Sequence, residues 1–175
     1  MPTRRPTRHE YPNQYARYVD LVSESNLLAA LVDQFQATHA LLRSLPAQRV
    51  HYRYASGKWT LQQIVGHVLD TERLFGLRLL AVARGDVTAH AVADEELWMR
   101  HAEFDRYRLP ALADEFLMVR QAHVSMLRHL PAAAWDRVGV VGGYAVSVRA
   151  LAYVLLGHER HHWNIVRAQY LPPDV

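Results

Sequence analysis

Four long stretches of the chain repeat apolar residues at steps of three and four, the spacing that places them along one face of a helix. The first predicted helix covers residues 25–45 and the second covers residues 60–84. The third covers residues 110–130, and the fourth begins at Ser147 and ends before the closing Pro172-Pro173. No stretch shows a strong alternating strand pattern, so the sequence predicts an all-α four-helix bundle.

Capping and breaking residues mark where these helices begin and end. Thr60 and Gln63 form a capping box at the start of the second helix, and Gly85 is a natural stop for it. Residues 94–98 are expected to open a short helix, and residues 139–147, which contain Gly142-Gly143, are expected to form a loop or a small hairpin before the last helix. The long connection between the second and third helices leaves two topologies open, a simple up-down bundle or one with crossovers.

Composition narrows the class of protein. A chain of 175 residues that is 50% hydrophobic predicts one domain over residues 1–175. The absence of cysteine excludes disulfides, thiolate metal sites and a cysteine nucleophile. Because the sequence shows neither an apolar signal segment nor a membrane-length apolar run, we expect a cytoplasmic protein without a membrane partner. The net charge of +3 comes from scattered arginines, which favours a solvated basic surface over nucleic-acid binding.

Eleven histidines are an unusual share, and two of them carry a pattern. His158 and His162 are four residues apart, so they lie one above the other on the apolar face of the last helix. Two imidazoles facing a core are costly unless each finds a partner. A divalent metal ion satisfies both at once, although core histidines that bond to neighbours are the alternative.

His67 is the predicted third ligand. It lies in the middle of the second helix, directly after Gly66, where a missing side chain allows a close approach. Three protein nitrogens leave at least one coordination position for water or substrate, the arrangement of a catalytic site. Imidazole suits Zn, Ni, Cu or Fe, and spacing alone does not choose among them.

Other residues near these histidines have alternative interpretations. His158 to His162 match the H-E-x-x-H zincin motif, but no downstream His or Glu supplies a third ligand, so a protease is disfavoured. Glu159 is then expected to face solvent or an arginine. His161 competes with His162 for the core face, His123 could be a fourth ligand or a proton-transfer group, and Asp70 could orient a ligand or form a surface ion pair.

Four segments together resemble the DinB/YfiT-like family: GKWTLQQIVGHVLDTER at residues 57–73, ARGD at 83–86, SVRAL at 147–151 and GHERHH at 157–162. The resemblance implies a four-helix bundle, often a homodimer, with nickel or zinc held by His67, His158 and His162. Relatives include bacillithiol- and mycothiol-dependent transferases and isomerases, and members described as metal-dependent hydrolases. Residues 87–101 depart from the acidic, Gly- and Pro-containing loop that borders the site in relatives.

Three functions follow from these observations. The first is a metal-dependent enzyme acting on a small-molecule substrate, preferably a low-molecular-weight-thiol S-transferase in which a thiol such as bacillithiol attacks an electrophile, with a metal-dependent hydrolase as the alternative. The second is a non-catalytic metal-binding stress-response module. The third, nucleic-acid binding through the arginines, is the least favoured.

Overall fold

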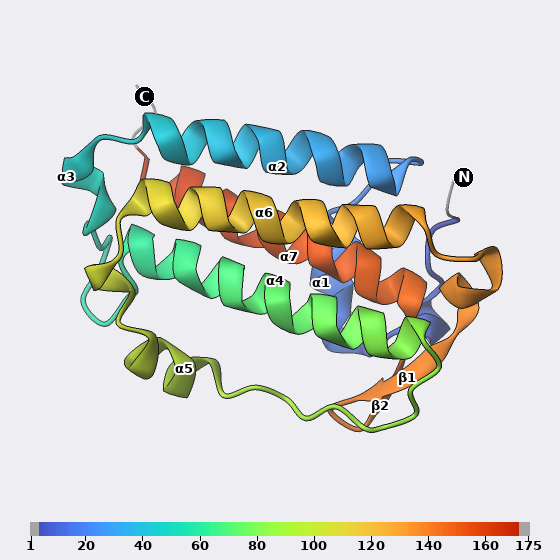
Figure 1. Ribbon diagram of the computed structural model, residues 1–175. Coiled ribbons are helices and arrows are strands. Elements are labelled where there is room, and N and C mark those ends of the chain that lie inside the picture. The colour runs from blue at the N-terminus through green and yellow to red at the C-terminus, as the bar shows by residue number, and fades with distance from the viewer. Residues whose placement is uncertain (1–3, 172–175) are drawn as a thin grey trace.

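Four long helices lie side by side in the computed structural model, which describes residues 4–171 (Figure 1). They are α2 (Leu27–Ser44), α4 (Leu61–Ala83), α6 (Leu109–Arg128) and α7 (Val148–Gln169). Each follows the predicted stretch to within a few residues, because the apolar stripe of each helix is what the bundle buries. The prediction of an all-α four-helix bundle is confirmed.

The topology differs from a simple up-down bundle. α2 and α7 run in one direction, and α4 and α6 run in the other (Figure 1). α2 packs mainly on α6, and α4 packs on both α7 and α6. Consecutive long helices α4 and α6 can be parallel because residues 84–108 return along the length of the bundle. The long connection, whose role the sequence left open, is therefore a crossover.

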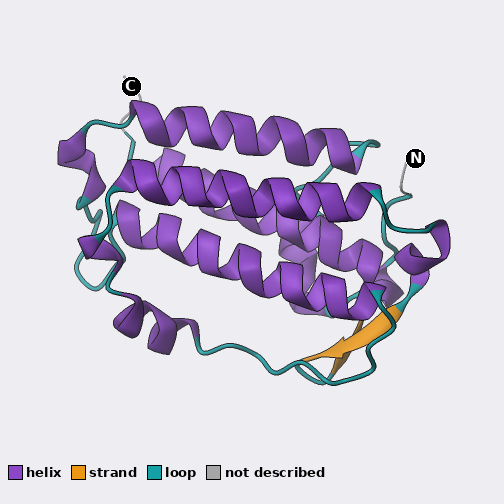
Figure 2. Ribbon diagram, in the orientation of Figure 1, coloured by secondary structure: helices purple, strands orange, loops and turns teal. Residues whose placement is uncertain are grey.

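The predicted caps are present. The Thr60 side chain accepts a hydrogen bond from the Gln63 amide at 3.0 Å, and the Gln63 side chain returns one from the Thr60 amide. Ser147 caps α7 by accepting from the amide of Ala150 at 3.0 Å. Before it, β1 (Val138–Val141) and β2 (Tyr144–Ser147) pair antiparallel, so the hairpin alternative is the one observed (Figure 2).

Several short elements had no counterpart in the predictions. The 3-10 turns Arg8–Glu10 and Asn13–Tyr15 lead into α1 (Ala16–Val19), which packs on α7. The helix α3 (Ala47–Val50) and the turns Phe104–Arg106 and Ala132–Asp136 lie in connections. The expected short helix is α5 (Glu95–Ala102), capped by the Asp94 carboxylate on the Leu97 amide. Short elements without a full apolar period carry little signal in the sequence.

One glycine permits the N-terminal segment to dock. A Cβ at Gly157 of α7 would collide with the backbone carbonyl of Tyr18. Backbone cannot move aside as a flexible side chain can, so only glycine allows α1 to lie this close to α7. The contact brings Tyr18 beside His158, the residue that follows Gly157.

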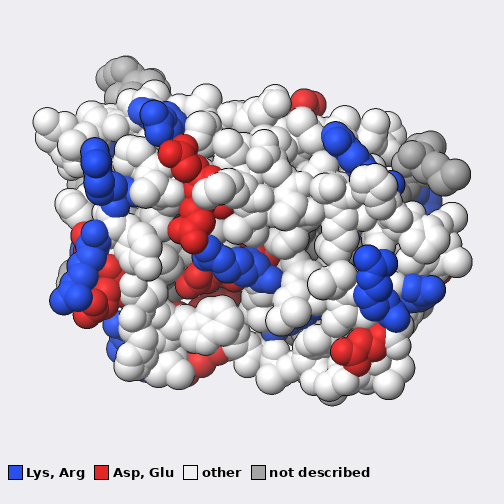
Figure 3. All heavy atoms as spheres, viewed as in Figure 1, with Lys and Arg blue, Asp and Glu red and all other residues white. Residues whose placement is uncertain are grey.

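Positively and negatively charged side chains are mixed on the visible surface. Figure 3 shows arginine and acidic side chains interspersed over the face formed by α2, α4 and α6. Mixed charges of this kind do not form the basic stripe expected for a nucleic-acid surface on this face. Among residues 4–171, no helix is both long enough and apolar enough to cross a bilayer.

Candidate metal centre

Three histidines from two helices converge inside the bundle. His67 comes from α4, and His158 and His162 come from α7. The Nε2 atom of His162 lies 3.2 Å from the Nε2 atom of His67 and 3.2 Å from that of His158. One nitrogen from each ring lies within 4.8 Å of the other two. The three side chains therefore come together inside the bundle, as the predicted metal site requires.

This spacing suits a metal ion. Two nitrogens bound at tetrahedral angles to one zinc-like ion, each about 2.05 Å from it, are about 3.3 Å apart. The two Nε2 separations of 3.2 Å agree with that value. A ring nitrogen either donates or accepts one hydrogen bond, so the Nε2 atom of His162 cannot satisfy both of its neighbours, whereas one cation accepts the lone pairs of all three rings. The donor set fits a divalent ion.

Burial keeps these rings neutral, which is the form that binds metal. His67 and His158 are buried, and His162 is partly buried. Burial lowers the pKa of His67 to about 4. Burial, followed by the charges of His67 and His161, lowers the pKa of His162 to about 3. The pKa of His158 falls well below its ordinary value for the same first reason.

Aromatic rings enclose the three histidines. The indole of Trp59 packs on His67, with ring centroids 4.9 Å apart. Tyr18 and Phe75 meet His158 edge-on at 5.2 and 5.9 Å. Aromatic walls exclude water and lower the local dielectric, so the electrostatic effect of an ion held here is strengthened. Tyr18 belongs to α1, the helix that the sequence did not predict.

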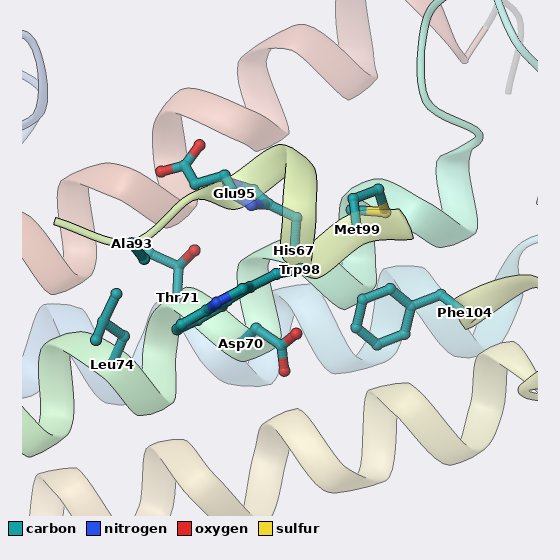
Figure 4. A pocket seen from close by; sticks show the side chains of 9 residues that line it. All are labelled: His67, Asp70, Thr71, Leu74, Ala93, Glu95, Trp98, Met99 and Phe104. Atoms are coloured by element: carbon teal, nitrogen blue, oxygen red, sulfur yellow. The ribbon is translucent and has the colours of Figure 1, made fainter. Parts of the chain in front are cut away.

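Two neighbouring cavities reach His67 and His158 from the side of α5. The smaller, about 10 Å³, is lined by His67, and the larger, about 150 Å³, is lined by His158. Both are also bordered by Thr71, Leu74, Ala93 and Glu95, so the two cavities are neighbours. Figure 4 shows the smaller cavity, where the indole of Trp98 from α5 lies beside Asp70.

None of the remaining sequence candidates is one of the three converging residues. His161 packs edge-on against His162 and Tyr18 and is not one of the three converging residues. His123 bonds through Nδ1 to Glu72 Oε1 at 2.8 Å and rests against Gly76, so it serves the bundle core. Asp70 pairs with Arg73 at 3.2 Å but also borders the cavity beside His67.

The acidic residue of the H-E-x-x-H pattern turns away from the histidines. Glu159 is buried and accepts hydrogen bonds from Arg120, Thr38 and Trp163. A zincin needs this carboxylate beside its metal as a general base. The structure agrees with the expectation that Glu159 faces an arginine, and the arginine is Arg120 in the core.

Three residues that border the site were missed in the sequence. Tyr18, Glu95 and Trp98 come from α1 and α5, which were unpredicted or only partly predicted. Short helices reach a site through tertiary contacts, which the spacing of apolar residues along the sequence does not indicate. The one available signal was Gly157 next to His158, since a glycine inside a helix marks a close approach.

The fold and the cluster define a class: a four-helix bundle with a crossover connection and, at its core, three converging histidines that could hold a metal ion. The family model of the DinB superfamily matches residues 30–166. This stretch includes all three histidines and most of the chain, and the chain belongs to the DinB superfamily. A comparison with curated proteins finds no match.

Two solved structures from Bacillus subtilis have the same fold. The first is YfiT, described as a probable metal-dependent hydrolase with an unusual four-helix bundle topology. It has a TM-score of 0.72 at 15% sequence identity, and the alignment covers 84% of this chain and 89% of YfiT. The second is the DinB-like protein YjoA, with a TM-score of 0.56 at 19% identity and coverage of 81% and 87%. At these sequence identities, the similarity shows a shared fold.

Proposed function

We propose that this protein is a metal-dependent enzyme that holds one nickel or zinc ion on His67, His158 and His162 and transfers a low-molecular-weight thiol to an electrophile. A divalent ion with an open coordination position lowers the pKa of a thiol or water bound to it and so supplies a nucleophile at neutral pH. The observation that carries the proposal is the meeting of three neutral imidazole nitrogens beside a cavity.

The residues around the histidines suit this role. The aromatic rings of Trp59, Tyr18 and Phe75 orient the imidazoles and keep water from their faces. Glu159 is held by Arg120, so H-E-x-x-H chemistry with this residue as base is not supported. A thiol bound to a cation needs no separate strong base, because its pKa is already close to neutral. These features favour thiol transfer.

A hydrolase is the second candidate, and one observation favours it. Asp70 and Glu95 border the cavity, and a carboxylate there could take a proton from water. Burial raises the pKa of both carboxyl groups, which moves them toward the range useful for a general base. The description of YfiT as a probable metal-dependent hydrolase also supports this reading. Replacing Asp70 or Glu95 with the amide should abolish hydrolysis and spare thiol transfer.

Metal content tests the site first. Elemental analysis of the purified chain should find about one divalent ion per chain, and His67→Ala and His162→Ala should lose most of it. His161→Ala is the matched control, because His161 is the neighbour of His162 and lies outside the three converging residues. Equal metal content in His162→Ala and the wild-type chain would contradict the proposed site.

Activity tests the reaction. The metal-loaded chain should consume a chromogenic aryl halide in the presence of bacillithiol, cysteine or glutathione, as an S–C bond forms and halide leaves. His162→Ala and a chelator should remove this activity, and added nickel or zinc should restore it only in the chelated wild-type chain. Full metal occupancy without turnover of thiols or esters would leave a non-catalytic metal-binding module and refute the enzyme.

A further inference from the structure

A buried arginine lines the larger cavity without a carboxylate partner. Arg78 of α4 is 4% exposed and borders the same cavity as His158. Its Nη2 donates to the Ala91 carbonyl at 2.6 Å, and its guanidinium packs on Phe75 at 5.5 Å from the ring centroid. Its buried Nε has no hydrogen-bond partner among residues 4–171, and within that range Arg78 forms no ion pair.

An unpaired guanidinium nitrogen in this position is costly. A buried polar group without a hydrogen bond costs about 1–3 kcal/mol, and a charged one costs more. The hydrogen bond to Ala91, which holds the connection between α4 and α5, uses only Nη2. It does not explain why Nε is buried without a partner. A ligand with an anionic group in this cavity would neutralise the guanidinium charge, which no carboxylate of residues 4–171 pairs with. A carboxylate matches the planar guanidinium best, because the two can form parallel hydrogen bonds.

The rest of the cavity limits what such a ligand can be. Arg17 also borders the cavity and donates to the Tyr18 hydroxyl at 2.8 Å. Among residues 4–171, Arg17 forms no ion pair with a carboxylate. Glu95 is the opposing negative charge on the wall. The volume of about 150 Å³ equals that of a cavity that admits benzene, so the space suits a ligand of a few carbons or one small ring.

We propose that the cavity binds a small organic carboxylate, whose carboxylate lies on Arg78 while the rest of the molecule faces His158. The inference rests on the proposed function and adds to it the chemical class of the substrate, an acid and not a neutral molecule. Arg78 is then a specificity-determining residue that selects the acid, and Arg17 adds positive charge at the same cavity.

Paired ligands test the inference by binding. Acetate, acrylate, butyrate and benzoate are each titrated against the corresponding amide by calorimetry, with the full chain as purified and after treatment with a chelator. We expect at least one acid to bind about tenfold tighter than its amide. The preference should disappear in Arg78→Met and persist in the matched control Arg84→Met, which removes an exposed arginine at the end of the same helix. Glu95→Gln should tighten binding of the acid.

The outcomes separate this inference from the metal site. No preference for any acid in the wild-type chain, or an equal preference in Arg78→Met, overturns it. If Arg78→Met does not fold, Arg78→Lys replaces it, since lysine keeps the charge but not the paired geometry and should weaken the preference several-fold; an unchanged preference again overturns the inference. The chelated chain excludes carboxylate binding to an ion, so a failure of metal binding is seen separately by elemental analysis.

Discussion

At the scale of single residues, hydrogen-bond donors surround the carboxylate of Glu159. Its two oxygens accept from Arg120 at 2.9 Å, from the Thr38 hydroxyl at 2.5 Å and from the Trp163 indole at 3.2 Å. The side chain is 1% exposed. A buried carboxylate with three donors is a structural element, because each donor would be left unsatisfied without it. The side chain of the neighbouring His158 lies about 100° around the helix and meets His162.

Glu159→Gln should therefore lower stability and spare metal binding. The amide nitrogen of glutamine cannot accept from Arg120 or Thr38, and Arg120 loses one of its two counter-charges. We expect a loss of about 3 kcal/mol in the free energy of unfolding, measured with urea. The metal content of the folded variant should match that of the wild-type chain. Normal stability combined with lost activity would instead indicate a general base.

At the scale of elements, the N-terminal segment is fastened to the start of α7. Glu10 accepts from the cap Ser147 at 2.7 Å and from Arg149 at 3.0 Å. The same carboxylate closes its own 3-10 turn by accepting from the Thr7 amide at 3.0 Å. Burial alone would raise the pKa of Glu10, but these hydrogen bonds and one from Arg4 hold the pKa at about 2.

This depressed pKa predicts how stability depends on pH. The Glu10 carboxylate binds protons less readily in the folded chain than in the unfolded chain, where its pKa is 4.5. It therefore contributes stability above pH 4.5, and the contribution is lost as pH falls toward 2. Glu10→Gln should cost about 2 kcal/mol at pH 7, and the difference from wild type should shrink through that range.

The control for this measurement is Glu96→Gln, an exposed carboxylate on α5 that forms no ion pair in residues 4–171. Its unfolding free energy should follow that of the wild-type chain at every pH. A difference between Glu10→Gln and wild type that stays constant from pH 7 to pH 2 would show that the ionised form of Glu10 does not matter. Denaturant unfolding at a series of pH values makes the comparison.

At the scale of the whole molecule, one charge network joins all four long helices. Arg120 of α6 forms two parallel hydrogen bonds to Glu72 of α4, at 2.6 and 2.8 Å, and one to Glu159 of α7. Thr38 of α2 completes the set through Glu159. Burial would raise the pKa of Glu72, but the charge of Arg120 and the hydrogen bonds from His123 and Arg120 lower it. The carboxylate therefore stays ionised in the core.

Arg120→Met should destabilise the whole bundle. It leaves Glu72 and Glu159 buried without their cation, and uncompensated charge costs about 3–5 kcal/mol. Adding Glu72→Gln and Glu159→Gln to Arg120→Met should restore part of the loss, since no buried charge then remains. Thermal and urea unfolding would report both changes. Equal stability of Arg120→Met and wild type would contradict this role for the network.

Much of this arrangement could be predicted from the sequence, for identifiable reasons. The apolar stripes located the four long helices, and Thr60 and Ser147 located two helix starts, because these signals lie within a few residues of one another. The pair His158 and His162 followed from the same local geometry. His67 was predicted as the third ligand from its place in the second helix directly after Gly66, but its distance from the pair depends on the packing of α4 against α7.

The sequence by itself determined the helices, their inward faces and the residue types available to hold an ion, because each is a property of neighbours along one helix. Only the tertiary structure decided the parallel course of α4 and α6, the turning of Glu159 toward Arg120 and the presence of Arg78 and Tyr18 at the cavity. These features join segments far apart in the chain. Their energies depend on distance and burial in three dimensions, which hydrophobic spacing along a single helix does not encode.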